Sequence, residues 1–255
     1  MNLAGKAAIV TGGGTGVGHA TSLLLAEQGC SVLVNYSRSR EQAEQTAADC
    51  EKRGVEALAF RADVSKDDDC RAMVSSAERA FGHLEVLVNN AAQTKFCAHD
   101  DLDGLDTSDW QQILGVNLIG PYLVTRAARG LLAAAEGGGE IVMTSSVAGL
   151  IGMGSSIAYC ASKAGLNSLT MTLARALAPK IRVNAIAPGF IDGDWMQQGF
   201  GAAYDQVKQD MVERTPLGQV ATPESVAAGI LSILTGPDLM TGHVVPHEGG
   251  IIIAL

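Results

Sequence analysis

The clearest chemical signal in the sequence comes from two side chains four residues apart, the phenol of Tyr159 and the ammonium of Lys163. On a helix this spacing places both groups on one face. A free tyrosine has a pKa of about 10, and a neighbouring cation lowers it, so the pair is suited to proton exchange with a carbonyl–alcohol couple. The spacing is common on protein surfaces, and an exposed pair without chemistry is the alternative.

A serine strengthens the chemical interpretation. Ser146 ends an apolar run, 141–146, which predicts a strand. In open α/β sheets ligands bind at the carboxyl ends of the strands, so Ser146 is expected at the same edge as the Tyr159 pair. Ser145 precedes it and competes for the same role.

A glycine-rich segment follows the first expected strand. Glycines allow positive φ, let backbone N–H groups approach a pyrophosphate, and let the next helix pack closely, while the helix amino end favours an anion. An ordinary glycine-rich turn is the alternative. The position in the first strand–helix turn favours dinucleotide binding, at Thr11, Gly12, Gly14, Thr15, Gly16, Val17 and Gly18.

The residues after the second expected strand indicate which dinucleotide binds. An NAD site places an acidic residue here for the ribose hydroxyl. This chain instead has Asn35, Tyr36, Ser37 and Arg38. Arg38 and the hydroxyls could hold a 2′-phosphate by charge-assisted hydrogen bonds, so we expect NADP(H) rather than NAD(H). Alternatively, Arg38 and Arg40 begin a solvated helix face.

Alternation of short apolar runs with helical patterns predicts the scaffold. The expected strands are Ala7–Thr11, Ser31–Asn35, Glu56–Phe60, Val86–Asn89, Glu140–Thr144, Arg182–Ile186 and His243–Val245. The expected helices are Val17–Gln28, Arg40–Arg53, Asp67–Phe81, Ser108–Ala135, Ile157–Ala178 and Pro223–Leu234. Ser108 with Gln111, and Thr222 before Pro223, are typical of helix starts. The fold class is α/β: a Rossmann-type doubly wound parallel sheet of about seven strands, with helices on both faces, in one domain over residues 1–255.

One segment, residues 189–218, breaks the strand–helix rhythm and predicts a lid at the carboxyl edge of the sheet. Its apolar residues could close over a substrate, or could form a small satellite core. The expected substrate pocket consists of Gln93, Phe96, Phe190, Trp195 and Met196.

With these motifs in their order, the chain resembles the short-chain dehydrogenase/reductases, single-domain NAD(P)-dependent oxidoreductases. Within this family it resembles the branch of the 3-oxoacyl-[acyl-carrier-protein] reductases. The resemblance covers nearly the whole chain and rests on T-G-x-x-x-G-x-G at 11–18, Asp63-Val64, Asn89-Asn90-Ala91, Asn117, Ser146, Tyr159, Lys163 and Pro188-Gly189.

The resemblance implies a role for each matching residue. Tyr159 would be the general acid/base, and Ser146, selected over Ser145 by its spacing, would bind the substrate oxygen. Lys163 would lower the pKa of Tyr159 and hold the nicotinamide ribose, and Asn117 would anchor a water chain to Lys163. The resemblance also implies cofactor contacts at Asp63, Val64, Asn89, Ala91, Pro188, Gly189 and Ile191.

Two positions depart from the family pattern. Ala92 stands where the family has glycine, and Gly193 stands where it often has a carboxamide-binding threonine. The carboxamide must then rely on backbone groups, such as those of Ile191, or on another lid residue. The carrier-protein reductases present basic residues beside the site, whereas this chain has Glu136 and Glu140 there, with Lys180 nearby. Like charges weaken docking of an acidic partner, so we favour a small or medium carbonyl substrate.

Composition excludes several other classes. Lys+Arg number 18 and Asp+Glu 27, a net charge of −9 that repels nucleic acid. The five cysteines form no C-x-x-C pair, so neither a disulfide framework nor a metal site is expected. No apolar run is long enough to cross a membrane. We expect a cytoplasmic homotetramer or homodimer, with the tail 251–255 suited to a subunit contact. An NAD-linked sugar or polyol dehydrogenase, and a non-catalytic NAD(P)-binding sensor or subunit, remain alternatives.

Overall fold

A parallel seven-stranded sheet forms the centre of the structure, a computed structural model that describes residues 1–254. The strands are β1 (Ala7–Val10), β2 (Ser31–Tyr36), β3 (Ala57–Arg61), β4 (Val86–Asn89), β5 (Gly139–Thr144), β6 (Ile181–Pro188) and β7 (Val244–His247). Their order is β3-β2-β1-β4-β5-β6-β7, and every pair is parallel. The chain reverses direction across the sheet between β1 and β4, which confirms the doubly wound fold.

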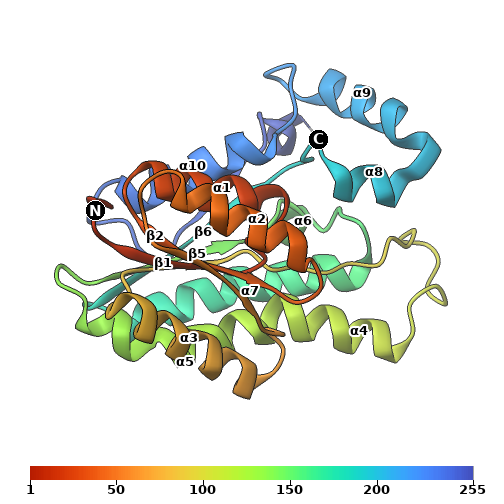
Figure 1. Ribbon diagram of the computed structural model, residues 1–255. Helices are drawn as coiled ribbons and strands as arrows, with labels where there is room; N and C mark the ends of the chain where they lie inside the picture. The colour runs from red at the N-terminus through yellow and green to blue at the C-terminus, as the bar shows by residue number, and fades with distance from the viewer. Residues whose placement is uncertain (255) are drawn as a thin grey trace.

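Helices cover both faces of the sheet (Figure 1). One layer contains α1 (Gly16–Glu27), α2 (Arg40–Glu51) and α10 (Pro223–Thr235), and the other contains α3 (Asp67–Phe81), α5 (Gly120–Ala134) and α7 (Ile157–Leu177). Each strand is therefore apolar on both sides. In β1, Ala8 and Val10 belong to the core under α1 and α10, whereas Ile9 belongs to the core under α3, α5 and α7.

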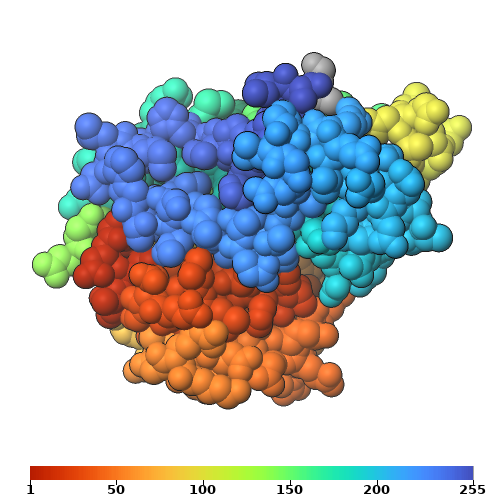
Figure 2. Space-filling model, turned by 90° about the horizontal axis from the view of Figure 1, so that it is seen from above, coloured from red at the N-terminus to blue at the C-terminus, as the bar shows by residue number. Residues whose placement is uncertain are grey.

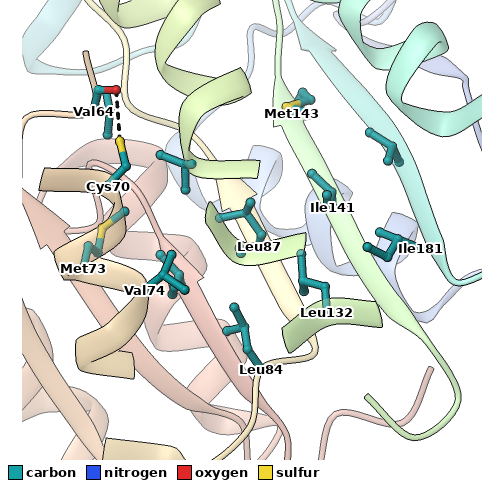
Figure 3. Close-up of a cluster of buried hydrophobic side chains, with 14 of the residues drawn as sticks. Val64, Cys70, Met73, Val74, Leu84, Leu87, Leu132, Ile141, Met143 and Ile181 are labelled. Carbon is teal, nitrogen blue, oxygen red and sulfur yellow. Dashed lines mark hydrogen bonds between the residues drawn. The ribbon is translucent and has the colours of Figure 1, made fainter. Parts of the chain in front are cut away.

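The second of these cores holds the sheet against α3 and α5. Figure 3 shows Met73 and Val74 of α3 beside Leu84 and Leu87, with Leu132 of α5 next to Ile141. All are at most 5% exposed, and complete burial of such a side chain contributes roughly 1.5–3 kcal/mol. This packing holds β4 and β5 in place, and the candidate site residues follow the carboxyl ends of these two strands.

The expected helix Ser108–Ala135 is present as one unbroken helical run over residues 107–134, with a π-helical turn in its middle. It consists of α4 (Thr107–Leu114), a π-helical turn (Gly115–Ile119) and α5. It also begins earlier than predicted, because Asp106 and Asp109 form the capping box rather than Ser108 and Gln111. The other predicted start is correct: Thr222 caps α10 before Pro223, with Ser225 as its capping-box partner.

Between β6 and α10 the chain forms α8 (Asp194–Phe200), a 3₁₀ turn (Gly201–Ala203) and α9 (Tyr204–Arg214). We call residues 189–218 the lid. Figure 2 shows the lid in light blue at one end of the molecule, beside the yellow segment that follows β4. The remaining short elements are α6 (Ala148–Ile151) and a 3₁₀ turn (Ile251–Ala254). Leu255, the last residue of the expected apolar tail, lies outside the described residues. None of the helices within residues 1–254 has the length and apolar character needed to cross a bilayer.

Candidate active site

The three residues of the candidate catalytic group lie on adjacent elements. Tyr159 and Lys163 belong to α7, and Ser146 is the second residue after β5. Ser156 caps α7 by accepting a hydrogen bond from the backbone N of Tyr159 at 3.3 Å. This cap places Tyr159 in the first turn of the helix, next to the end of β5.

Lys163 is almost completely buried, at 2% exposure. Its Nζ donates a hydrogen bond to the carbonyl oxygen of Thr144 at 2.7 Å and lies 5.6 Å from the ring centroid of Tyr159. Burial lowers the pKa of Lys163 to about 7, because the charged form loses its hydration. The Lys163 side chain is therefore held beside the phenol in a buried position that disfavours its charged form.

The pKa of Tyr159 moves in the opposite direction from the one we expected. Burial raises it to about 12, and the neighbouring Ser146 hydroxyl opposes that rise only in part. Lys163, whose Nζ donates to the Thr144 carbonyl and whose charged form is disfavoured by burial, does not offset this rise. At neutral pH the phenol is a proton donor.

The two adjacent serines face different surroundings. Ser145 is buried, and its hydroxyl donates to Oδ1 of Asn167 at 2.5 Å. Ser146 is beside Tyr159, and its Oγ accepts a hydrogen bond from the backbone N of Ala148 at 3.1 Å. Ser146 is thus the serine that the structure brings to the phenol.

Asn117 lies within the π-helical turn and is completely buried. Its Oδ1 accepts from the backbone N of Gln93 at 2.7 Å, and its Nδ2 donates to the Gln93 carbonyl at 2.8 Å and to Ser162 Oγ at 3.0 Å. The Ser162 hydroxyl in turn donates to the carbonyl of Tyr159 at 2.7 Å. Asn117 therefore links the segment after β4 to the helix that carries Tyr159 and Lys163.

The glycine-rich turn has a shape that fits an anion. Gly16 has φ +51° and no atom within 4 Å of where a Cβ would lie, so the amino end of α1 is uncovered on that side. Thr15 precedes α1 and makes no side-chain cap. A Cβ on Gly18 would lie 2.1 Å from the Gly12 carbonyl oxygen, so the turn closes this tightly only with glycine there. The backbone N–H groups of the first turn of α1 are available to a pyrophosphate.

Buried polar side chains brace this turn from behind. Asn35 Oδ1 accepts from the backbone N of Gly12 at 3.2 Å, and Thr11 Oγ1 accepts from the backbone N of Asn90 and of Ala91 at 2.9 and 3.0 Å. Thr11 and Asn35 are at most 2% exposed, so their side chains belong to the framework behind the turn. Our site prediction omitted Asn90, whose Nδ2 donates to the Thr11 carbonyl at 3.0 Å. The motif Asn89-Asn90-Ala91 was the available signal.

The two arginines after β2 differ in their pairing. Arg40 is bound to Glu44 at 2.7 Å. Arg38 is exposed, as is Ser37, and no ion pair within residues 1–254 includes it. Tyr36, at the end of β2, is partly exposed. The guanidinium of Arg38 is thus available to a ligand.

Asp63 follows β3 and is partly exposed. Burial opposes its ionisation, but hydrogen bonds from Ser65 N and Oγ at 3.0 and 2.7 Å outweigh burial and lower the pKa of the carboxyl. Val64 is different, since its side chain packs in the core and its carbonyl accepts from Cys70 Sγ at 3.2 Å (Figure 3). Of the two, only Asp63 presents its side chain toward solvent.

The remaining cofactor-site candidates lie at the ends of β4 and β6. Asn89 is buried, with its Nδ2 3.3 Å from Thr125 Oγ1. The Pro188 carbonyl accepts from Val147 N at 3.0 Å, and Gly189 N donates to the His247 carbonyl at 3.1 Å. Ile191 forms an isolated parallel bridge with Ala221. These backbone contacts fix the base of the lid.

The predicted pocket residues lie in three different surroundings. Phe96 and Phe190 pack with Phe200 and Tyr204 at centroid distances of 5.3–6.3 Å, which is the satellite-core arrangement. Trp195 instead lies edge-to-face against Tyr159, 6.4 Å between centroids. Met196 and Gln93 are partly exposed, and Gln93 Nε2 donates to Gln112 Oε1 at 3.0 Å. Within residues 1–254 no cluster of three or more His, Cys, Asp or Glu could hold a metal ion.

Comparison with known proteins places the chain in a family. Residues 6–203 match the family described as short chain dehydrogenase. A Streptomyces violaceoruber protein, which carries the name ketoacyl reductase 2 of the granaticin polyketide synthase, is 40% identical over 95% of this chain and 94% of its own. The 3-oxoacyl-[acyl-carrier-protein] reductase of Synechocystis is 34% identical over 98% of each chain. The crystal structure of an NAD⁺-bound xylitol dehydrogenase aligns with a TM-score of 0.88 and 31% identity, over 98% of this chain and 100% of that one. The chain is an oxidoreductase of the 3-oxoacyl reductase-like branch, and it belongs to the short-chain dehydrogenase family.

Proposed function

We propose that the protein reduces a carbonyl compound to a secondary alcohol with NADPH, and that Tyr159 donates the proton. The observation that carries the proposal is the grouping of Ser146, Tyr159 and Lys163 at the carboxyl edge of the sheet. The raised pKa of Tyr159 keeps the phenol protonated at neutral pH, as a proton donor to a carbonyl oxygen must be.

The bound nicotinamide supplies the hydride. The chain's own residues would orient the carbonyl: the hydroxyls of Ser146 and Tyr159 donate to its oxygen and stabilise the charge that develops there. Lys163, behind the phenol, would bind the nicotinamide ribose and hold Tyr159 in place. Asn117 would keep the Tyr159 helix in register with the segment after β4 through Ser162 and Gln93.

The dinucleotide would lie with its pyrophosphate at the amino end of α1. The turn at Gly12, Gly14, Gly16 and Gly18 and its flanking residues Thr15 and Val17 would hold it. Asp63 would face the adenine. The free guanidinium of Arg38, helped by Ser37, supports NADPH over NADH, because a 2′-phosphate is recognised by charge-assisted hydrogen bonds. Asn35, Thr11 and Asn90 would act indirectly by bracing the turn.

The substrate we favour is a small or medium ketone or a 3-oxoacyl compound. Two relatives carry ketoacyl or 3-oxoacyl reductase names, which supports this class. The likeness to an NAD⁺-bound xylitol dehydrogenase supports a second candidate, an NAD-linked polyol dehydrogenase. The absence of an acidic residue at the end of β2 argues against that candidate.

We also propose that the protein forms a homotetramer or homodimer in the cytoplasm. Ile119 and Tyr122, beside and within α5, and Met171 of α7 are 42–50% exposed, which suits a helical subunit contact. All five cysteines are free, as expected in a reducing compartment. Light scattering on the purified protein measures the oligomeric state, and a dilution series that yields only monomer contradicts it.

The reaction is tested by following reduced-nicotinamide absorbance across a panel of ketones, 3-oxoacyl thioesters and polyols, with NADPH and NADH in parallel. We expect turnover with NADPH and a ketone or 3-oxoacyl thioester. Tyr159→Phe should lower kcat by about 100-fold or more and leave the dissociation constant of NADPH unchanged. Wild-type turnover in that variant excludes the proposed role of Tyr159. Tight binding of NADPH without turnover of any panel member indicates a non-catalytic sensor or subunit instead.

A further inference from the structure

The indole of Trp195 is the lid side chain that reaches the candidate proton donor. Its ring meets the Tyr159 ring edge-to-face, at an interplanar angle of 77° and 6.4 Å between centroids. Trp195 is nevertheless 44% exposed, so much of its surface faces outward from this contact. Trp195 therefore offers an uncovered apolar surface beside the Tyr159 ring.

Asp192 lies at the base of the lid, three residues before Trp195, and makes several contacts. The carboxylate of Asp192 accepts hydrogen bonds from the Tyr204 hydroxyl and from Lys208 Nζ, both on α9. Its backbone N donates to the Ala221 carbonyl at 2.8 Å, next to the bridge between Ile191 and Ala221. The residue Asp192, before α8, is therefore bonded both to α9 within the lid and, through Ala221, to the body of the protein.

A second anchor holds the far end of α8. The ring of Phe96, from the segment after β4, lies directly on Gly199, where a Cβ would come within 2.1 Å of Phe96 Cζ. Phe96 also packs edge-on against Phe200 at 5.3 Å. The yellow segment after β4 and the light blue lid accordingly lie side by side in Figure 2. Both ends of α8 therefore make contacts outside the helix, and the helix carries Trp195 to the Tyr159 ring.

We propose that Trp195 determines specificity by selecting carbonyl compounds in which a flat, unsaturated substituent adjoins the carbonyl carbon. This inference rests on the proposed carbonyl reduction. The carbonyl oxygen must lie within hydrogen-bond reach of the Tyr159 hydroxyl. Trp195 packs against that same ring and keeps 44% of its surface exposed, so one substituent of the carbonyl can lie along the indole. An aromatic or conjugated group can stack flat on the indole with its whole face in contact, whereas a puckered group of equal size brings fewer atoms to van der Waals distance.

Acetophenone and cyclohexyl methyl ketone test this directly, because they have the same carbon skeleton and differ in the flatness of the ring. We expect the wild type to prefer acetophenone in kcat/KM. Trp195→Ala should lower kcat/KM for acetophenone by about 10-fold and change the value for cyclohexyl methyl ketone much less, so the preference collapses. Trp195→Phe should keep it.

A merely structural role for Trp195 gives a different pattern. Loss of lid stability lowers kcat/KM for both ketones by the same factor, and an unchanged preference in Trp195→Ala overturns the inference while leaving the proposed reduction intact. Trp110, on α4, provides the matched control: Trp110→Phe should leave the preference unaltered.

Fluorescence tests the inference independently of turnover. The chain has two tryptophans, so Trp110→Phe leaves Trp195 as the sole indole emitter. With Tyr159→Phe added to stop turnover and NADP⁺ present, 1-phenylethanol should change this emission saturably, and 1-cyclohexylethanol should do so only at much higher concentration. Equal responses to the two alcohols, or no response, overturn the proposed role of Trp195. If these responses differ as expected while no carbonyl is reduced, the proposed function fails and the binding surface stands.

Discussion

The hydroxyl of Ser145 donates to Oδ1 of Asn167 at 2.5 Å, whereas the hydroxyl of its neighbour Ser146 lies beside Tyr159. Alternation of side chains at the end of β5 thus sends one serine into the core and the other toward the site. The pair is a natural matched control.

Substitution of each serine in turn should separate chemistry from packing. Ser146→Ala should lower kcat by about 100-fold or more, since a donor to the reacting oxygen is removed. Ser145→Ala should leave kcat unchanged and lower the free energy of unfolding by about 1–3 kcal/mol, because Asn167 Oδ1 loses its buried partner. Steady-state kinetics and urea denaturation measure the two effects. Equal kinetic loss in both variants contradicts the assignment.

The two arginines after β2 give a second matched pair. Arg38→Ala should weaken NADPH binding by about 10-fold or more and leave NADH binding almost unchanged, because only NADPH carries the 2′-phosphate. Arg40→Ala should change neither affinity appreciably, since Arg40 is bound to Glu44. Titration calorimetry with both cofactors decides. A fall in NADPH affinity confined to Arg40→Ala would show that Arg40, and not Arg38, binds the 2′-phosphate.

Much of this site could be predicted from the sequence. The strands agree within a few residues, because each is a short apolar run between turns, and the Tyr159–Lys163 spacing needs only a helix to place both on one face. The pKa of Tyr159 was mispredicted because it depends on burial by residues distant in the chain. The same holds for Asn35, whose location suggested a ligand contact but whose amide is buried behind the glycine turn.

Burial of Lys163 should make the stability of the cofactor-free protein depend on pH. Its pKa falls from 10.5 to about 7 on folding, so the folded state disfavours the charged form. The stability present above pH 10.5 is therefore lost as the pH falls toward 7. The Lys163→Met variant lacks this titratable group. As the pH falls from 10.5 to 7, its free energy of unfolding should therefore rise relative to that of the wild type. The rise should be a few kcal/mol in total (about 1.4 kcal/mol for each pKa unit).

Urea denaturation of both proteins without cofactor, at pH 9.5 and pH 7, measures this difference. The titration of Tyr159 occurs in both proteins and cancels in the comparison. A Lys163→Met variant whose stability relative to the wild type does not change with pH contradicts the burial cost assigned to the lysine.

Two glycines should respond oppositely to alanine. Gly130 lies in the exposed part of α5 with no atom within 4 Å of a Cβ position, so Gly130→Ala should stabilise the protein by about 0.5–1 kcal/mol. Gly18→Ala would place a Cβ 2.1 Å from the Gly12 carbonyl oxygen and should disrupt the turn. Thermal melts and NADPH titrations distinguish them, and an NADPH affinity equal to wild type in Gly18→Ala contradicts the tight turn.

The lid illustrates what an apolar pattern leaves open. The sequence shows that aromatic residues cluster in 189–218, but not which of them face one another. Phe96, far away in the chain, completes the cluster with Phe190 and Phe200, and this leaves Trp195 on the Tyr159 side. Packing between segments far apart in the sequence therefore determines which aromatic residue lies next to Tyr159.

The π-helical turn at Gly115–Ile119 has a consequence for sequence change in this region. Such a turn holds one residue more than an α-helical turn, so a single deletion inside it would yield one uninterrupted α-helix. The half of the helix before the deletion would then swing by about 100° about the axis relative to the half after it. Gln112 would turn away from Gln93, and Asn117 could not keep both Gln93 and Ser162. The rotational position of α4 relative to α5 therefore depends on the one extra residue in the π-helical turn. Insertion or deletion of a single residue should be far less tolerated here than a point substitution.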